Sequence, residues 1–236
     1  MGHEMMIGAT PEPVAINPSK TAVIVVDMQN DFGSSGGMFD RAGIDISGIQ
    51  RAMGPTARVL ANGRALGMKI IYLKMGYRSD LSDLGSSGAR NRMVHLRFGV
   101  GEPVTSPDGS EGGVLIRDTW GTDIVTELAP QDGDIIMYKT RFSGFYGTDL
   151  DSVLKTAGIT TLIVTGCTTS VCVESTIRDA FFRDYRCVLL TDCTSEPIGH
   201  GMSRSNHDAS LLLIEIMFGW LSTSEQFLKS SVAISA

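Results

Sequence analysis

Residues 160–192 read TTLIVTGCTTSVCVESTIRDAFFRDYRCVLLTD, and their pattern decides the fold. The apolar runs at 160–166 and 186–192 are continuous, as expected for strands that are buried on both faces. Between these runs the apolar side chains recur at helical spacing, at Val173, Ile177, Ala180 and Phe181. The stretch therefore predicts a strand, a helix and a second strand that lies parallel to the first.

Four further stretches share this apolar, strand-like character, at residues 21–27, 68–74, 134–138 and 217–222. Helical patterns separate them: one opens at Pro55 and stops at Gly67, and others cover 149–158 and 203–216. Strands that alternate with helices indicate an α/β fold, with a parallel sheet covered on both faces. A length of 236 residues suits one domain of this type, although two small domains would also fit.

Composition narrows the classes of partner and location. The chain has a net charge of −6 and no basic cluster, which argues against nucleic acid as a partner. No apolar run reaches membrane-spanning length, and no secretory signal is visible, so we expect a cytoplasmic protein without membrane contact. The four cysteines form no CxxC pair, so a disulfide framework is not expected. Residues 1–20 are punctuated by proline and are expected to form a surface arm.

One long segment interrupts the alternation of strands and helices. Residues 75–119 are rich in glycine, serine and arginine. A loop of this length inside a compact domain is usually functional or disordered. We expect it to line a substrate pocket, either of its own chain or of a neighbouring subunit, or else to decorate a subunit contact.

Three chemically useful side chains follow three of the predicted strands. Asp27 ends the first strand, Lys139 follows the strand at 134–138, and Cys172 begins the helix after 160–166. Sites in open α/β sheets form at the carboxyl ends of the strands, so these side chains are expected to lie together. A helix start and a lysine would favour a thiolate at Cys172, and Asp27 could accept its proton. The pattern indicates nucleophilic catalysis by cysteine.

Each of these residues also has a simpler explanation. A strand-end aspartate is often a turn former, a lysine is often a solvated charge, and a cysteine is often a small buried hydrophobic residue. Other chemistries have less support. The four histidines are scattered, as surface or loop histidines would be, and no Cys/His set has zinc spacing. GxGxxG and P-loop patterns are absent, so no metal and no nucleotide cofactor are expected.

At these same residues the chain resembles the isochorismatase-like cysteine hydrolases. The resemblance rests on VIVVDMQNDF (23–32), the lysine at 139 and the stretch at 160–192, and it runs over about residues 10–230. It implies a single three-layer α/β/α domain over 1–236 with a six-stranded parallel sheet. It also implies a catalytic triad of Asp27, Lys139 and Cys172, a cis peptide before Thr168, and an oxyanion hole formed by the backbone N–H groups of Thr168 and Cys172.

Within that family, KTRFSGFYGTDLDSVL (139–154) and TSVCVEST (169–176) are similar to the branch that hydrolyses ureidoacrylate. This likeness implies an amidohydrolase that cleaves a C–N bond of a small ureido or carbamoyl compound through a cysteine thioester. The loop at 75–119 looks closer to hydrolases of biuret and triuret, so a neutral substrate with the same triad is the alternative. A non-catalytic binding member of the fold is a second alternative. The family resemblance also implies a homo-oligomer, a dimer or a tetramer.

A ureidoacrylate carboxylate would need a cation, because an unpaired buried charge is costly. Arg141 is the first candidate, and the loop arginines Arg90, Arg92 and Arg97 are others. Further residues expected to bind substrate are Asn30, through a ureido oxygen, and the aromatic side chains Phe32, Tyr77, Phe142 and Tyr146. Turn capping by Asn30 and core packing by Phe32 and Phe142 would explain those residues nearly as well.

Overall fold

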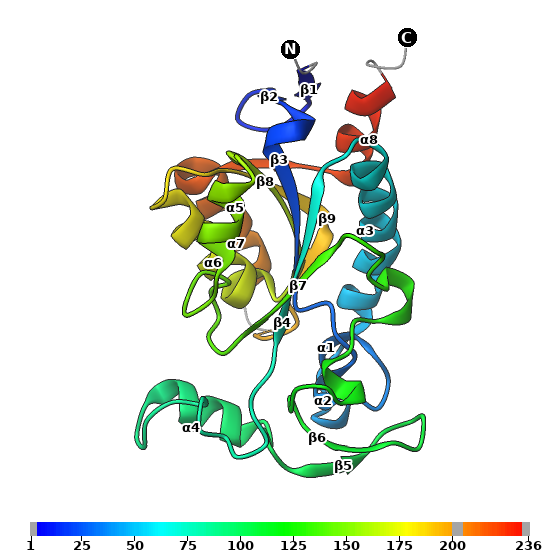
Figure 1. The fold of residues 1–236 in the computed structure, drawn as a ribbon, viewed down its shortest axis with the longest axis vertical. Coiled ribbons are helices and arrows are strands. Elements are labelled where there is room, and N and C mark those ends of the chain that lie inside the picture. Colours follow the sequence, from blue (N-terminus) through cyan, green and yellow to red (C-terminus); the bar gives the residue numbers. More distant parts are fainter. Residues whose placement is uncertain (1–3, 200–204, 233–236) are drawn as a thin grey trace.

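The computed structural model describes residues 4–199 and 205–232. A six-stranded sheet forms its centre, in the order β10-β9-β8-β3-β4-β7, and every neighbouring pair runs parallel (Figure 1). Its strands are β3 (Thr21–Val26), β4 (Lys69–Met75), β7 (Ile135–Lys139), β8 (Thr161–Cys167), β9 (Arg186–Ser195) and β10 (Trp220–Ser222). The parallel α/β sheet expected from the sequence is confirmed.

The central strands β3 and β8 owe their position to their composition. All six residues of β3 and all seven of β8 are buried. Valine, isoleucine and threonine make up most of both strands, and such β-branched side chains suit a strand that is packed on both faces. The edge strand β7 is less enclosed, since its Ile136 is 50% exposed. The core is therefore centred on β3 and β8, whose carboxyl ends lead into the candidate site.

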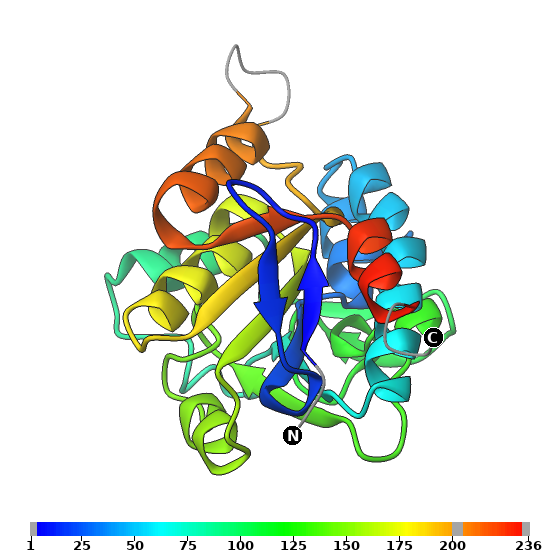
Figure 2. The ribbon, with the colours of Figure 1, turned by 90° about the horizontal axis from the view of Figure 1, so that it is seen from above.

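Helices cover both faces of the sheet and complete the three layers (Figures 1 and 2). One face carries α5 (Leu150–Thr156), α6 (Glu174–Phe181) and α7 (Asn206–Leu213). The other carries α3 (Ser47–Ala65) and α8 (Ser224–Val232). The described part of the helix predicted at 203–216 is α7 and the π-helical turn that follows it, η5 (Ile214–Phe218).

The helix α3 begins earlier than its pattern predicted. We expected Pro55 to open it, but the helix begins at Ser47 and Pro55 lies inside it. Buried side chains continue along one stripe on both sides of the proline, from Ile49 to Leu60. Burial of this stripe outweighs the backbone hydrogen bond that a proline removes. The predicted end is correct, because Gly67 follows the last turn with a φ of 72°, a conformation that glycine adopts readily.

Residues 4–20, expected as a surface arm, contain a two-stranded antiparallel hairpin of β1 (Met5–Ile7) and β2 (Val14–Ile16). It lies by the amino ends of the sheet strands, and alternate side chains are buried, at Met5, Ile7, Val14 and Ile16. The remaining short elements are η1 (Pro18–Lys20), α1 (Asn30–Gly33), α2 (Met38–Arg41), η2 (Trp120–Thr122), η3 (Thr126–Leu128) and η4 (Thr169–Val173). Among the described residues no helix is both long and apolar enough to cross a membrane.

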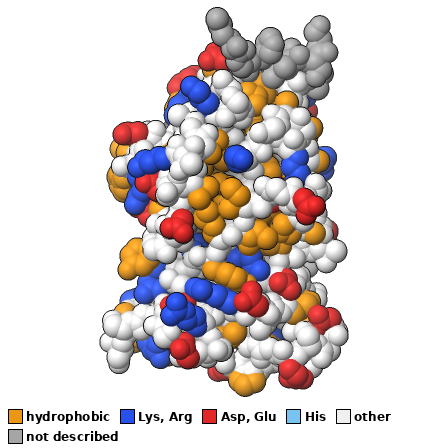
Figure 3. Space-filling view, in the orientation of Figure 1, with side chains coloured by type: hydrophobic (Ala, Val, Ile, Leu, Met, Phe, Trp, Pro, Cys, Tyr) orange, Lys and Arg blue, Asp and Glu red, His pale blue; other side chains and the backbone are white. Residues whose placement is uncertain are grey.

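The segment at 75–119 has structure of its own. It contains the helix α4 (Arg90–Arg97) and an antiparallel pair, β5 (Pro103–Thr105) and β6 (Glu111–Gly113). A bridge between Tyr77 and Ile116 closes its base. The segment lies beyond the carboxyl ends of the sheet strands, in the lower part of Figure 1. In the same orientation, basic side chains gather over this lower part, with acidic ones between them (Figure 3).

Candidate active site

Asp27 and Lys139 meet at the carboxyl ends of the sheet. Asp27 directly follows β3 and Lys139 ends β7, with β4 between their strands. The Oδ2 atom of Asp27 lies 2.7 Å from Nζ of Lys139, and the side chains are 1% and 0% exposed. Each of these two buried, opposite charges stabilises the other, because either one alone in this position would be strongly destabilising. The sequence analysis expected these residues to lie together, and the structure brings them into contact.

The backbone at Asp27 has a positive φ of 51°. This left-handed conformation is uncommon for residues other than glycine, although aspartate tolerates it better than most. The amide of Asp27 is fixed by a hydrogen bond to the carbonyl of Leu73 on β4, at 2.9 Å. Sparsely populated backbone conformations persist where the surrounding structure enforces them, and they are frequent at functional sites.

Cys172 lies in the π-helical turn η4, which leads from β8 into α6. Its side chain is 6% exposed. The thiol is near enough to Asp27 and Lys139 for each of them to act on its ionisation. The structure thus gathers the three predicted catalytic side chains from three strand ends into one buried group.

The turn before Cys172 has a compact backbone. The peptide bond between Cys167 and Thr168 is cis, as the family resemblance implied. The amides of Val171 and Val173 both donate to the carbonyl of Thr168, at 3.1 and 3.2 Å. The proposed oxyanion hole, formed by the N–H groups of Thr168 and Cys172, would lie at the two ends of this turn.

The ionisation of the Cys172 thiol differs from what the sequence suggested. Burial raises the pKa of the Cys172 thiol, and the nearby charge of Lys139 does not offset this, so the resting side chain is a neutral thiol. We expected a lowered thiol pKa, which is wrong because desolvation outweighs the cation. Burial also raises the pKa of Asp27 against the opposing charge of Lys139. Burial lowers the pKa of Lys139, but Asp27 and Cys172 reverse this, so that pKa is raised and the ammonium persists.

The turn that carries Cys172 is held by residues at the end of β9 and on α7. Ser170 donates to Oε2 of Glu196 through its amide, at 2.9 Å, and through its hydroxyl, at 2.5 Å. The Thr169 hydroxyl lies 2.9 Å from that of Thr194 and 3.0 Å from Nδ1 of His207. His207 is therefore a half-buried part of this network and not a free surface histidine. These contacts hold the turn from the end of the sheet and from one covering helix.

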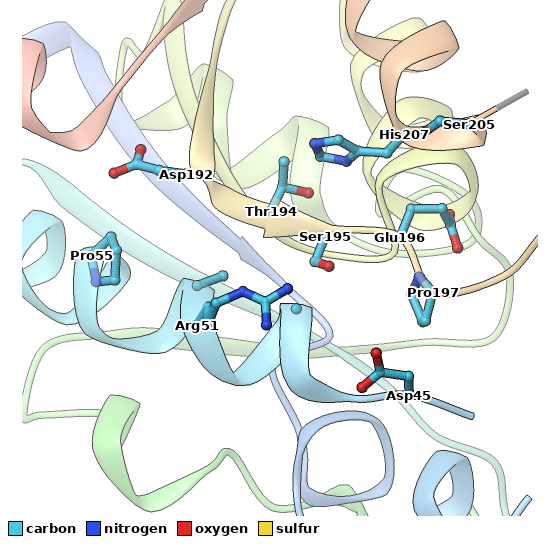
Figure 4. Close-up of a pocket in the computed structure, with 12 residues that line it drawn as sticks. Asp45, Arg51, Pro55, Asp192, Thr194, Ser195, Glu196, Pro197, Ser205 and His207 are labelled. Carbon is cyan, nitrogen blue, oxygen red and sulfur yellow. The ribbon is translucent and has the colours of Figure 1, made fainter. Parts of the chain in front are cut away.

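A pocket of about 480 Å³ lies behind this network, between α3 and the end of β9 (Figure 4). Its lining includes Arg51, Asp192, Thr194, Glu196 and His207, and it includes none of the proposed catalytic residues. In Figure 4 the Arg51 side chain of α3 faces the strand that carries Thr194 and Ser195. The pocket is thus separate from the buried thiol and shares with it the side chains that hold the turn.

Two residues expected to bind substrate are engaged by the protein itself. The amide of Asn30 donates to the carbonyl of Trp120 at 2.8 Å and accepts a hydrogen bond from the Ser34 hydroxyl at 2.8 Å. Phe32 is 8% exposed and packs edge-on against Phe39, with ring centroids 5.1 Å apart. Turn capping and core packing, the simpler explanations given for them, account for both.

The other four residues expected to bind substrate lie around a shared region. Tyr77 is fully buried and lies close to Cys172 and to Asp27, whose charge acts on the Tyr77 hydroxyl. Arg141 lies over the ring of Tyr146, which is 58% exposed, at 5.5 Å. Phe142 is half-buried and packs on the core.

His95 is a member of this region that the sequence analysis missed. We expected a surface or loop histidine, but His95 lies on α4 and is 6% exposed. Its ring is 5.2 Å from that of Tyr77 and 5.6 Å from that of Phe142, between centroids. No short motif marks it, because its neighbours come from distant parts of the chain. His3 and His200 lie outside the described residues.

Comparison with known proteins agrees with this architecture. An isochorismatase domain model matches residues 21–226. The ureidoacrylate amidohydrolase RutB of Variovorax paradoxus (strain S110) is 39% identical over 231 residues, which cover 98% of this chain and 89% of that protein. The ureidoacrylate amidohydrolase RutB of Agrobacterium fabrum (strain C58 / ATCC 33970) is 40% identical over 223 residues, covering 94% and 95% of the two chains.

Solved structures of related proteins have a similar fold. A cysteine hydrolase from Pseudomonas syringae pv. phaseolicola 1448A superposes with a TM-score of 0.77 at 32% sequence identity, covering 92% of this chain and 95% of that one. An isochorismatase family protein from Desulfovibrio vulgaris subsp. vulgaris str. Hildenborough gives a TM-score of 0.71 at 27% identity, covering 92% and 99%. With its parallel sheet, its strand-end residues and these matches, the chain belongs to the isochorismatase family.

Proposed function

We propose that this chain is an amidohydrolase that cleaves a C–N bond of a small ureido compound resembling ureidoacrylate, with Cys172 as the nucleophile. The observation that carries the proposal is the buried Asp27–Lys139 ion pair beside a buried cysteine thiol. Relatives named ureidoacrylate amidohydrolases cover nearly the whole chain, which supports the substrate class. A non-catalytic member of the fold would have no need to keep two charges and a thiol together away from water.

In the proposed reaction, the sulfur of Cys172 attacks the ureido carbonyl carbon while Asp27 accepts the thiol proton. The raised pKa of Asp27 makes its carboxylate a stronger base, and the raised pKa of Cys172 means that this transfer is needed. Lys139 holds the carboxylate in place. The N–H groups of Thr168 and Cys172 would stabilise the developing oxyanion.

Collapse of this intermediate breaks the C–N bond. Asp27 returns the proton to the leaving nitrogen, which departs as an amine or as ammonia, and the acyl group remains on the sulfur. Asp27 then deprotonates a water molecule that attacks this thioester. Hydrolysis releases a carbamate, which decays to carbon dioxide and the second nitrogen product, and it restores the thiol.

We further propose that Arg141 binds the carboxylate of an acidic substrate. Its Nη1 donates to two neutral carbonyls, those of Thr140 at 2.6 Å and Asp83 at 3.2 Å. Within the described part of the chain no carboxylate forms an ion pair with it. A partly buried guanidinium without an anion is suited to a carboxylate ligand, to which it can donate two hydrogen bonds.

The alternative substrates, biuret and triuret, are neutral and would leave Arg141 without a counter-charge. Their support is the sequence likeness in the loop at 75–119. We also propose that the chain acts as a single domain, in the cytoplasm, and as a homo-oligomer. Size-exclusion chromatography with light scattering would measure the oligomeric state directly.

Ammonia release from a panel of substrates tests the proposal. The panel contains ureidoacrylate, biuret, triuret, N-carbamoyl amino acids, nicotinamide and isochorismate. We expect the highest kcat/KM with ureidoacrylate, and Arg141→Leu should raise KM for it but not for biuret. Cys172→Ser should remove turnover of every compound. Preference for a neutral compound would move the assignment to the biuret and triuret hydrolases, and no turnover of any ureido compound would refute it.

A further inference from the structure

His95 is a buried histidine that none of the proposed reaction steps uses. It lies on α4, and its ring is packed edge-to-face against Tyr77 and at a tilt of 31° against Phe142. Tyr77 follows β4, and Phe142 follows Lys139 at the end of β7. The two rings therefore hold His95 beside the strand ends that carry the proposed catalytic group.

The hydrogen bonding of His95 defines its tautomer. Nδ1 lies 2.7 Å from the carbonyl oxygen of Asn91. A carbonyl can only accept, so Nδ1 carries the proton. Burial lowers the pKa of His95, and the charges of Lys139 and Arg141 lower it further, so the ring is neutral near pH 7. Nε2 therefore presents a lone pair, and no described residue donates a hydrogen bond to it.

Two cationic side chains and a tyrosine hydroxyl lie near His95. Lys139 and Arg141 are cations, and the Tyr77 hydroxyl already donates to a backbone carbonyl at 3.3 Å. A ureido group offers one carbonyl acceptor and N–H donors on both of its nitrogens. Its carbonyl would meet the oxyanion-hole N–H groups, whereas its N–H groups need acceptors. Asp27 can accept from the nitrogen that leaves, and Nε2 of His95 is a second acceptor in the same region.

We propose that His95 is a specificity-determining residue, whose Nε2 atom accepts a hydrogen bond from the ureido nitrogen that does not leave. This inference rests on the function proposed above and deepens it. The Asn91 carbonyl fixes the tautomer, and the two aromatic rings fix the plane of the imidazole. The site therefore prefers substrates with an N–H at that position over substrates that lack one, because a buried acceptor left without a donor weakens binding.

Two variants of His95 and a matched control test this role. His95→Phe keeps a ring but removes the acceptor, and His95→Gln places an amide oxygen near the position of Nε2. Met93→Phe is the control, because Met93 lies on the same helix and is 42% exposed. The measurements are kcat and KM for ureidoacrylate and for two analogues, in each of which methylation leaves one ureido nitrogen without an N–H, together with the thermal midpoint of each variant.

We expect His95→Phe to raise KM for ureidoacrylate roughly 10-fold with little change in kcat, the size of one lost hydrogen bond to a buried partner. His95→Gln should restore part of the affinity, and Met93→Phe should behave as the wild type. One N-methyl analogue should be disfavoured roughly 10-fold by the wild type and not by His95→Phe. If the thermal midpoint shows that His95→Phe folds poorly, the discrimination of the wild type against that N-methyl analogue remains the test, because it needs no substitution.

The outcomes separate this inference from the proposed function. The role of His95 alone would be overturned if the wild type turns over ureidoacrylate and both His95 variants keep its KM and its discrimination between the analogues. Absence of wild-type turnover of every ureido compound would overturn the proposed function, and the role of His95 with it.

Discussion

Replacing Lys139 by methionine is expected to destabilise the chain far more than removal of an ordinary lysine. The variant leaves the carboxylate of Asp27 buried without the ammonium that lies 2.7 Å from it. Breaking a buried ion pair on one side costs about 3–5 kcal/mol in the free energy of unfolding. For a chain of this size, that corresponds to a fall of about 6–20 °C in the thermal midpoint.

The pH dependence of Lys139→Met has a definite sign. Burial already raises the pKa of Asp27, and removal of the cation that opposes this raises it further. The folded state then binds a proton more tightly than the unfolded chain, whose aspartate pKa is about 3.9. Stability is therefore greatest below about pH 4 and falls as pH rises toward the folded pKa of Asp27. The variant should lose less stability relative to the wild type at pH 5 than at pH 8.

The assay is urea unfolding at pH 5 and pH 8, followed by circular dichroism. Lys155→Met is the matched control, because the Lys155–Asp151 pair lies on the surface of α5 and the lysine side chain is 66% exposed. Such a pair contributes at most about 0.5 kcal/mol. Asp27→Asn combined with Lys139→Met should recover part of the loss, since both charges are then absent. A loss in Lys139→Met no larger than that in Lys155→Met would refute the reasoning.

Three further predictions concern the nucleophile, its turn and the sheet. Alkylation of Cys172 by iodoacetamide should be slow at pH 8 and become faster toward alkaline pH, because burial raises the pKa of its thiol. Mass spectrometry of the labelled peptide measures the alkylation rate, and fast labelling at pH 7 would contradict the raised pKa. Glu196→Ala should lower kcat about 10-fold or more with a smaller change in KM, because the turn loses its two hydrogen bonds from Ser170. Glu196→Gln retains one acceptor and should lose less activity. Equal kcat values in steady-state assays of the two variants and the wild type would count against this role. Gly166→Ala should prevent stable folding, because a Cβ there would overlap with the backbone of β3. Gly158 also has a positive φ but open space around it, so Gly158→Ala should lower the free energy of unfolding by only about 1 kcal/mol. Similar losses of stability in chemical unfolding of the two variants would argue against the close approach of β8 to β3 at Gly166.

The strand layout could be predicted from the sequence because it depends on local composition. The runs that became β3 and β8 are continuous and apolar, and this pattern is typical of strands covered on both faces. The position of Asp27, Lys139 and Cys172 at one edge follows because the carboxyl ends of parallel strands meet at the same edge of a sheet. The order of the strands was not predicted, because it depends on pairing between distant segments. The start of α3 could not be predicted in this way, because the burial that tolerates Pro55 comes from the sheet beneath it.

The environment of the site depended on contacts between distant segments. The raised pKa of Cys172 results from burial, which no short motif reports. His95 is 44 residues from Lys139 in sequence, and its burial depends on how α4 folds back onto the strand ends. In the same way, the hydrogen bonds that occupy Asn30 come from the segment around Trp120. Sequence identified the candidate catalytic side chains, and tertiary packing determined their ionisation and their neighbours.

Mass spectrometry of an acid-quenched reaction tests the central claim most directly. Ureidoacrylate is mixed with the wild-type protein and with Asp27→Asn, the reaction is stopped within one turnover, and the peptide that contains both Cys167 and Cys172 is sequenced. The proposed mechanism predicts an acyl adduct on Cys172, none on Cys167, and none on either residue in the Asp27→Asn variant, which lacks the proton acceptor. Turnover without an adduct, or an adduct on Cys167, would contradict the assignment of Cys172 as the nucleophile.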